Sequence, residues 1–176
     1  MTDFSGTLYT IDSPTPGRLA TMARPPGHGS LDRQMAALQA SGVDVVVSLQ
    51  GADERAEAGL SGEPDAVRRA GLEFRELPIR DMDVPDVAAA RALVDALIGD
   101  LRAGRNVVVH CWAGIGRSST IAAAVLIRLG AEAEQACRTV GAARGMRVPE
   151  TAHQRAWLDD WAAACAADAD GTPPSA

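Results

Sequence analysis

The segment NVVVHCWAGIGRS at residues 106–118 carries the clearest structural signal in this chain. Residues 106–110 form an apolar run rich in valine, which is typical of a strand buried on both faces of a sheet. A glycine-containing turn follows and leads into an apolar stretch at residues 118–129, which has the length of a helix. The segment therefore predicts a strand, a tight loop and a helix, with the loop at the carboxyl edge of the sheet, where α/β proteins bind ligands.

Strands and helices alternate on both sides of this segment. Strand-like stretches are expected at residues 8–11, 19–23, 43–49, 72–79 and 106–110. Helices are expected at residues 31–41, 86–103, 118–129, 132–144 and 150–166, with one or two short ones within residues 52–70. This order predicts an α/β sandwich around a mostly parallel sheet.

Spacing also predicts details within the helices. Ser30 precedes the first helix and is placed to cap it. Trp157 and Trp161 lie four residues apart, which indicates packing of a helix. In the helix over residues 86–103, one face is apolar and is expected to contact the core. The residues on that face are Val87, Ala90, Val94, Leu97, Ile98 and Leu101.

Length and composition indicate a single domain. We expect it to span residues 1–167 of the 176, and we expect the polar tail at residues 168–176 to be disordered. The longest apolar runs are too short for a membrane span, and the first twenty residues lack an export signal. A net charge of −6 argues against a broad nucleic-acid or anionic-membrane surface. A cytoplasmic protein is therefore expected, and the bias toward Arg, Ala and Gly suggests a bacterial gene.

Residue usage excludes several kinds of chemistry. All 17 basic residues are arginines, so Schiff-base chemistry and a Walker-type nucleotide loop, which both need lysine, are excluded. Cys111, Cys137 and Cys165 are far apart and show no zinc-ligand spacing with the three histidines. We expect no metal, no cofactor and no disulfide framework, and we interpret Cys137 and Cys165 as packing residues.

A cysteine and an arginine flank the tight loop. Successive backbone N–H groups in such a loop can turn inward and bind a tetrahedral oxyanion, and Gly114 and Gly116 permit the dihedral angles that this requires. A thiol that faces a helix N-terminus and a guanidinium becomes a thiolate, so Cys111 is the expected nucleophile. Arg117 can bind two phosphate oxygens, and Ser118 is placed to donate a hydrogen bond to the sulfur. Together these residues predict phosphoryl transfer through a phosphocysteine.

The segment HCWAGIGRS resembles the His-Cys-x5-Arg-Ser/Thr signature of the protein tyrosine phosphatase superfamily, especially its compact dual-specificity and kinase-associated members. Weaker similarity covers roughly residues 40–160. The resemblance implies a three-layer fold with four or five strands, and hydrolysis of phosphomonoesters without a metal. It also implies that His110 supports the loop by hydrogen bonding. The loop residues that it implies for substrate binding are Trp112, Ala113, Gly114, Ile115, Gly116 and Arg117.

The resemblance further implies a general acid about thirty residues before the cysteine, commonly four residues before a proline. Asp81, in the stretch DMDVP at residues 81–85, matches this placement, and Asp83 is the competitor. Residues 148–154 are similar to a segment whose glutamine helps to orient the hydrolytic water, which points to Gln154. Arg144 and Arg147 precede that glutamine, and we interpret them as solvated side chains that at most widen a positive rim.

Three rival functions differ from this one in the residues that they require. A phosphoinositide phosphatase tends to place lysines within the loop, whereas the variable loop positions here are uncharged. A catalytically weak phosphate-binding module would have lost the nucleophile or the acid, and a rhodanese-like sulfur transferase generally lacks the Gly-x-Gly-Arg-Ser ending. Three Trp, one Tyr and two Phe are too few to favour a deep tyrosine pocket over a shallow dual-specificity cleft. We therefore expect a phosphorylated protein or peptide as substrate, and binding of phosphate, sulfate or vanadate.

Overall fold

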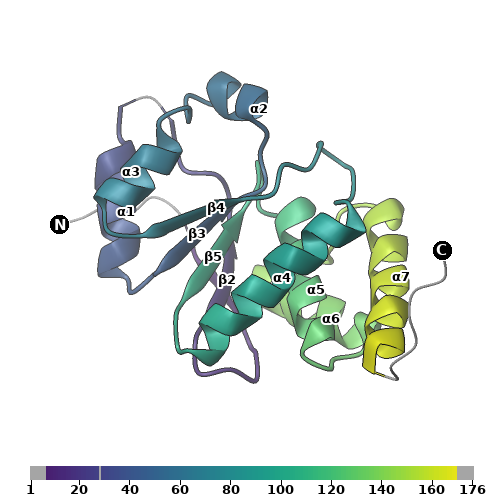
Figure 1. Cartoon of the computed structure of the whole chain (residues 1–176). Helices are drawn as coiled ribbons and strands as arrows, with labels where there is room; N and C mark the ends of the chain where they lie inside the picture. The colour runs from purple at the N-terminus through teal and green to yellow at the C-terminus, as the bar shows by residue number, and fades with distance from the viewer. Residues whose placement is uncertain (1–6, 28, 170–176) are drawn as a thin grey trace.

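A mixed sheet of five strands forms the middle layer of the described structure (Figure 1). The computed structural model describes residues 7–27 and 29–169. The strands are β1 (Tyr9–Ile11), β2 (Leu19–Met22), β3 (Val45–Ser48), β4 (Glu73–Glu76) and β5 (Val107–His110). Their order across the sheet is β1-β2-β5-β3-β4, and β1 alone runs antiparallel to its neighbour. The predicted mostly parallel α/β fold is confirmed.

Strand β5 lies between β2 and β3 at the centre of the sheet. Every residue of these three strands is buried, which explains their continuous apolar sequence. Met22 and Ser48, the last residues of β2 and β3, both pair with His110 at the end of β5. Because the three strands end level with one another, Cys111 leaves the sheet at its carboxyl edge, between two parallel neighbours.

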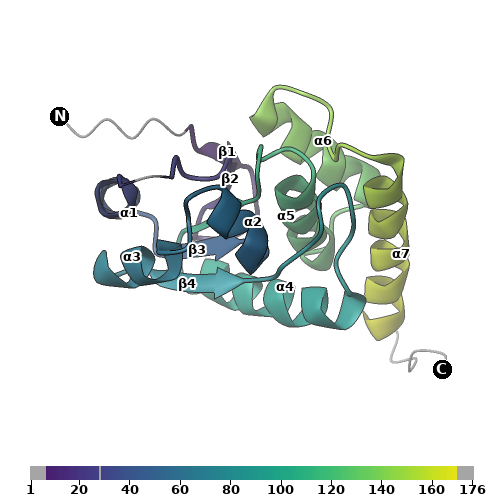
Figure 2. The same ribbon diagram turned by 90° about the horizontal axis from the view of Figure 1, so that it is seen from above.

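The described chain has seven helices, and six of them cover the two faces of the sheet (Figure 2). Helices α1 (Leu31–Ala40) and α3 (Glu63–Arg69) lie on one face, and the short helix α2 (Ala52–Glu57) lies above the carboxyl edge. The other face is covered by α4 (Val87–Arg102), α5 (Arg117–Arg128), α6 (Ala133–Arg144) and α7 (Ala152–Ala169). The larger apolar core fills the space between these four helices and the sheet. None of the described helices has the length and hydropathy needed to cross a membrane.

The last helix packs as predicted and is longer than predicted. Trp157 and Trp161 are buried, with ring centroids 5.3 Å apart, and the indole Nε1–H of Trp161 donates to the Ala124 carbonyl at 3.1 Å. Helix α7 ends at Ala169, two residues into the predicted tail. Residues 170–176 of that tail lie outside the described residues.

Two predicted helix details are wrong. Ser30 occupies the N-cap position of α1, but its side chain accepts no backbone N–H of the helix. Its hydroxyl instead donates to the Pro26 carbonyl at 3.4 Å and accepts a side-chain N–H of Gln34. Val87 is 46% exposed, because the first turn of α4 projects past the sheet (Figure 1). The five other residues predicted for that face are buried, and α4 is capped by Asp86, whose carboxylate accepts the Ala89 N–H at 2.9 Å.

Candidate active site

The loop between β5 and α5 places the predicted nucleophile at the carboxyl edge of the sheet. Cys111 follows directly after β5 and is 3% exposed. Its Sγ lies 3.5 Å from the Oγ of Ser118, which belongs to the first turn of α5. The thiol thus faces the N-terminal end of a twelve-residue helix, where the partial positive charge of the helix favours an anion.

The two loop glycines are required for different reasons. Gly114 has a φ of +71°, and a Cβ at this position would lie 2.4 Å from the Met22 carbonyl oxygen, so a side chain is excluded by both conformation and space. Gly116 has a φ of −82° and a ψ of −82°, so its φ lies outside the left-handed region that favours glycine. A Cβ on Gly116 would lie 2.9 Å from Oε2 of Glu150 and 3.1 Å from the side-chain amide of Gln154.

The backbone N–H groups of residues 112–116 point at no acceptor within residues 7–27 and 29–169. Carbonyl groups of the same loop are, by contrast, hydrogen-bonded. The Trp112 carbonyl accepts the backbone N–H of Arg24 at 3.0 Å, and the Gly116 carbonyl accepts the Thr120 N–H at 2.9 Å. A series of N–H donors without protein acceptors is the feature that binds a tetrahedral anion in such loops.

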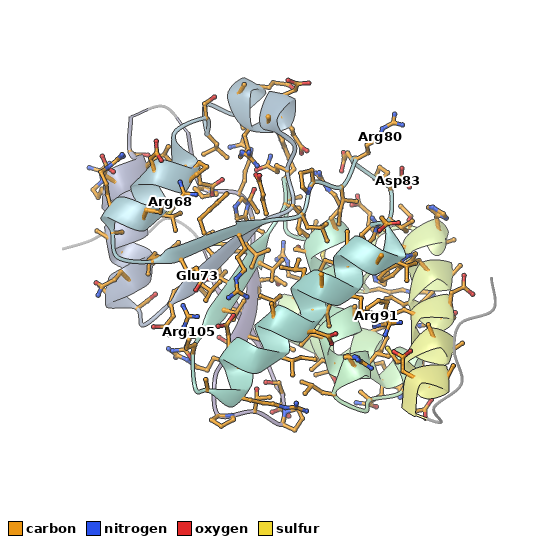
Figure 3. All side chains as sticks on the ribbon, in the orientation of Figure 1. Arg68, Glu73, Arg80, Asp83, Arg91 and Arg105 are labelled. Atoms are coloured by element: carbon orange, nitrogen blue, oxygen red, sulfur yellow. The ribbon has the colours of Figure 1, made fainter. Side chains whose placement is uncertain are left out.

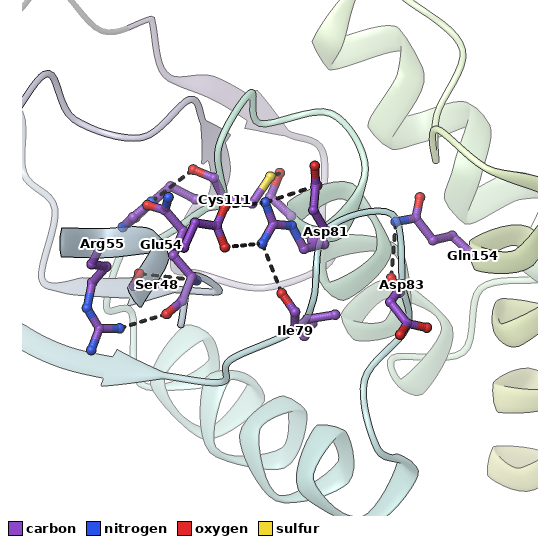
Figure 4. A network of polar contacts seen from close by, with 12 residues as sticks. Ser48, Glu54, Arg55, Ile79, Asp81, Asp83, Cys111 and Gln154 are labelled. Carbon is purple, nitrogen blue, oxygen red and sulfur yellow. Dashed lines mark hydrogen bonds and ion pairs between the residues drawn. The ribbon is translucent and has the colours of Figure 1, made fainter. Parts of the chain in front are cut away.

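Arg117 is 2% exposed and is held by acidic and carbonyl groups (Figure 4). Its two terminal nitrogens donate to the two carboxylate oxygens of Glu54 at 2.7 Å each. The Nη1 group also donates to the Ile79 carbonyl at 2.9 Å, and Nη2 lies 3.1 Å from Oδ1 of Asp81. Burial alone would lower the pKa of Arg117, but the hydrogen bonds that it donates to Glu54 and the nearby charges of Cys111, Glu54 and Asp81 raise it above its usual value.

Glu54 was not singled out from the sequence. It lies on the short helix α2, and 63 residues separate it from Arg117, so no local spacing connects them. Burial alone would raise the pKa of Glu54, but the hydrogen bonds and charge of Arg117 outweigh this and lower it. Glu54 therefore remains a carboxylate that fixes the plane of the Arg117 guanidinium.

The two candidate acids are bound differently. Asp81 is 71% exposed and contacts Arg117. Asp83 accepts the Val84 N–H at 2.9 Å and lies 3.4 Å from Nε2 of His153. The Val84 N–H is the main cause that lowers the pKa of Asp83 below its usual value, with a smaller contribution from His153. Figure 3 shows Arg80 and Asp83 on the outer side of the loop that leads into α4.

Gln154 lies beside the loop, as predicted, and is fully buried. Its side-chain N–H donates to the Asp83 carbonyl at 3.2 Å, and its side-chain oxygen accepts the Thr151 N–H at 3.3 Å. Thr151 in turn accepts the Gln154 N–H at 3.0 Å, so the two residues cap α7 reciprocally. Gln154 therefore links the start of α7 to the loop that carries both acids (Figure 4).

His110 contacts both the loop and a buried acid. Its Nδ1 lies 3.3 Å from the Cys111 carbonyl. Its Nε2 lies 2.8 Å from Oε1 of Glu63 at the start of α3, and both side chains are fully buried. Glu63 could not be identified from the sequence, because its spacing within α3 is that of an ordinary helical residue.

Trp112 lies at the surface of the site, whereas the two other cysteines lie away from it. Trp112 is 38% exposed, and the guanidinium of Arg24 lies 4.3 Å from its ring centroid. Burial raises the pKa of both Cys137 and Cys165, which pack between helices as predicted. Within the described residues, no three His, Cys, Asp or Glu side chains are grouped as metal ligands.

Arg144 is half-buried and its guanidinium is bound to the cysteine loop, so the interpretation of a merely solvated side chain is wrong. Its Nε–H donates to the Gly114 carbonyl at 2.6 Å, and its Nη2 group donates to the Ala113 carbonyl at 2.9 Å. Arg147, in contrast, is exposed. Arg144 thus contacts the cysteine loop from α6, a helix 30 residues further along the chain.

Comparison with known families gives one match across most of the fold. The model described as "Tc-R-P: Polymorphic toxin system, DSP-PTPase phosphatase" matches residues 20–131. That range runs from β2 to the end of α5 and contains every residue of the cysteine loop as well as Glu54 and Asp81.

Similar proteins are known from sequence and from structure. Human cyclin-dependent kinase inhibitor 3 is 30% identical over 99 residues, which are 55% of this chain and 47% of that protein, so the chain spans about half the length of this relative. The solved structure of kinase associated phosphatase, with its catalytic-site cysteine replaced by serine, has a TM-score of 0.82 at 20% identity and covers 92% of this chain and 96% of its own.

Two further solved structures have the same fold. Tk-PTP in its active form has a TM-score of 0.74 at 27% identity, over 89% of this chain and 96% of its own. PTPMT1 in complex with PI(5)P has a TM-score of 0.74 at 23% identity, over 90% of this chain and 98% of its own.

Proposed function

The chain belongs to the DSP-PTPase phosphatase family of polymorphic toxin systems, within the protein tyrosine phosphatase superfamily, and we propose on this basis that it hydrolyses phosphomonoesters on proteins without a metal. One observation carries the proposal. Cys111, Arg117 and Asp81 come together beside a loop whose N–H groups have no acceptor among the described residues. This arrangement suits a nucleophile, a phosphate clamp and a proton donor.

Phosphate binding uses the donors of Arg117 that Glu54 leaves available. A guanidinium has five N–H groups, and Glu54 and Ile79 accept three of them, from the two terminal nitrogens. The Nε–H and the second N–H of Nη2 then face the substrate and bind two phosphate oxygens. Asp81 now lies 3.1 Å from Nη2, so an incoming phosphate replaces it there and moves its carboxyl group toward the leaving oxygen.

The reaction then proceeds in two displacements. The Cys111 thiolate attacks phosphorus, an S–P bond forms, the P–O bond to the substrate breaks, and protonated Asp81 gives its proton to the leaving oxygen. A water molecule next attacks phosphorus, its proton passes to Asp81, and the S–P bond breaks. Ser118 donates to the departing sulfur over the 3.5 Å contact. The loop N–H groups and Arg117 stabilise the charge on the phosphoryl oxygens in both steps.

Gln154 acts on the acid loop in this scheme. Its amide is engaged with the Asp83 carbonyl and the Thr151 N–H, so it holds the loop that carries Asp81 against α7. The predicted role in orienting the hydrolytic water requires that the Asp83 contact opens during the second step.

A phosphorylated protein is the substrate class that the loop favours. Its variable residues Trp112, Ala113 and Ile115 carry no charge, whereas a ring with several phosphates would need additional cations in the loop. Trp112 is exposed beside the site and offers an apolar surface to a peptide. Kinase associated phosphatase is a structural relative with a protein partner in its name, and PTPMT1 is one that was solved with a phosphoinositide.

Substrate profiling with purified protein tests the proposal. Para-nitrophenyl phosphate turnover is measured in EDTA, followed by phosphopeptides and a short-chain phosphoinositide. We expect EDTA-resistant turnover, a preference for phosphopeptides, and loss of turnover in Cys111→Ser. Full activity of Cys111→Ser would overturn the mechanism, and a preference for the phosphoinositide would overturn the substrate class.

A further inference from the structure

The carbonyl groups of the cysteine loop are bound by donors that lie outside the loop. Three consecutive carbonyls are engaged in this way: Trp112 by the Arg24 N–H at 3.0 Å, Ala113 by Nη2 of Arg144 at 2.9 Å, and Gly114 by Nε of Arg144 at 2.6 Å. One side chain thus holds two successive peptide units. Because each peptide unit is planar, the direction of its carbonyl group also fixes the direction of its N–H group.

In a trans peptide the C=O and N–H bonds point in opposite directions. The Ala113 carbonyl belongs to the same plane as the Gly114 N–H, and the Gly114 carbonyl to the same plane as the Ile115 N–H. With both carbonyls turned toward Arg144, both N–H groups turn away from it, toward the interior of the loop. Neither N–H has an acceptor in the described part of the chain.

Arg144 is itself held in one orientation. It is the last residue of α6, and its guanidinium carbon lies 3.8 Å from the ring centroid of Tyr9 on β1. Stacking on an aromatic face leaves the edge of the guanidinium available to donate in its own plane. Gly145 follows with a φ of +73° and ends the helix immediately beyond Arg144.

We infer that Arg144 is a positioning residue that orients the N–H groups of Gly114 and Ile115 toward the bound phosphoryl group, with Tyr9 holding its guanidinium in place. The inference rests on the proposed function, because it assigns Arg144 a part in the same oxyanion site. Arg144 does not contact the reacting atoms. Its planar fork can bind two carbonyls at once, whereas a lysine has a single nitrogen and cannot reproduce that geometry.

Direct oxyanion binding tests this inference without relying on turnover. Tungstate, a tetrahedral dianion, is titrated calorimetrically into Cys111→Ser protein that carries a second substitution. The test variants are Arg144→Ala, Arg144→Lys, Tyr9→Ala and Tyr9→Phe. Arg138→Ala is the matched control, because Arg138 lies on the same helix and contacts exposed Glu134 and Gln135.

We expect Arg144→Ala to raise the tungstate Kd by about tenfold to a hundredfold, as when a group that orients other ligands is lost. Arg144→Lys keeps the charge and should restore only part of the affinity. Tyr9→Phe should behave as wild type, Tyr9→Ala should lose part of the affinity, and Arg138→Ala should lose none. In protein that retains Cys111, Arg144→Ala should raise KM and the vanadate inhibition constant. Partial unfolding of the variant would instead lower only the apparent kcat.

The outcomes separate this inference from the proposed function. If Cys111→Ser protein binds tungstate and Arg144→Ala leaves that affinity unchanged, the inference is overturned and the function stands. Full rescue by Arg144→Lys also overturns it, since charge alone would then be sufficient. If Cys111→Ser protein binds no tungstate, both proposals fail together. Should Arg144→Ala not fold, as judged by circular dichroism, Arg144→Lys and Tyr9→Ala supply the same test.

Discussion

At the scale of single residues, Asp81 and Asp83 differ in what their carboxyl groups contact. Asp83 is bound by the Val84 N–H, which lowers its pKa, so it gives up its proton at a lower pH than an ordinary aspartate. A general acid must reach the leaving oxygen, whereas the Asp83 carboxylate is held by the Val84 N–H and lies beside His153. Asp81 carries no such backbone bond and faces Arg117.

Replacing the two aspartates separately should show which one donates the proton. Asp81→Asn is expected to lower kcat for a substrate with a poor leaving group by about a hundredfold or more, and to remove the alkaline limb of the pH–rate profile. Asp83→Asn should leave kcat close to wild type, because Asn keeps an oxygen that accepts the Val84 N–H. The profiles are measured with an alkyl phosphate. The assignment is reversed if Asp83→Asn alone abolishes the alkaline limb.

The three cysteines should react at different rates. Burial raises the pKa of Cys137 and Cys165, so both remain neutral thiols at neutral pH, whereas Cys111 faces the start of α5 and Arg117. Iodoacetamide at pH 7 is therefore expected to modify Cys111 first, and vanadate to protect it. Peptide mass spectrometry gives the order of modification. Faster labelling of Cys165 in folded protein would contradict the idea that Cys111 is an activated thiolate.

Site residues could be predicted from sequence where the contact is local. Cys111 and Ser118 are seven residues apart, at the two ends of the cysteine loop, and their 3.5 Å contact follows from the turn between them. The contact between Glu54 and Arg117 bridges 63 residues, and Arg144 contacts a carbonyl 30 residues away. Both contacts depend on how the helices are placed around the sheet. The spacing of apolar residues does not reveal polar partners that are so far apart in the sequence.

At the scale of elements, the β5–loop–α5 unit depends on one glycine. Gly114 has a positive φ, and a Cβ at this position would lie only 2.4 Å from the Met22 carbonyl oxygen, so two constraints act on the same residue. Its carbonyl also faces Arg144. Any shift of this backbone therefore disturbs strand β2, helix α6 and the anion-binding loop together.

Gly114→Ala should accordingly destabilise the protein and abolish oxyanion binding. We expect a loss of about 1–3 kcal/mol in the free energy of unfolding, as for a residue forced into a disfavoured backbone conformation. Gly99→Ala is the control: Gly99 lies within α4 with nothing within 4 Å of its added Cβ, and the change should stabilise that helix by about 0.5–1 kcal/mol. Urea unfolding measures both changes. Equal stability of the two variants would contradict the assigned strain.

Element boundaries at helix ends were the least predictable feature. The spacing located all the major helices, but Ser30 makes no capping bond and Val87 is exposed at the start of α4. Both errors occur where a helix begins, because the first turn is fixed by the chain that enters it. Asp86 does cap α4, because its carboxylate accepts the Ala89 N–H.

At the scale of the whole molecule, pattern predicted the layers but not the strand order. The run of valines in β3 and β5 showed that both strands are buried. Their placement side by side at the centre, with β2 next to β5, is set by helix packing on the two faces. That order brings Met22, Ser48 and His110 to one edge and so creates the site.

The folded molecule should lose stability in acid. Hydrogen bonds from Arg105 and Arg75 lower the pKa of Glu73, which lies with Arg105 at the edge of the sheet (Figure 3). The pKa is lowered in the same direction for Glu54, Asp83 and Glu134. Unfolded carboxyls titrate near about pH 4, so below that pH the unfolded chain binds protons that the folded chain does not, and the free energy of unfolding falls.

Alkaline pH should destabilise the fold through its buried thiols. Cys137 and Cys165 have raised pKa values because they are buried, whereas an unfolded thiol titrates near about pH 8.5. Above that pH the unfolded chain releases protons that the folded chain retains, so the free energy of unfolding falls again. Urea unfolding in reducing buffer of constant ionic strength should therefore give a plateau between about pH 5 and pH 8. Glu73→Gln should flatten the acid side and Cys137→Ala the alkaline side, and a stability that kept rising below pH 4 would contradict the ion pairs as described.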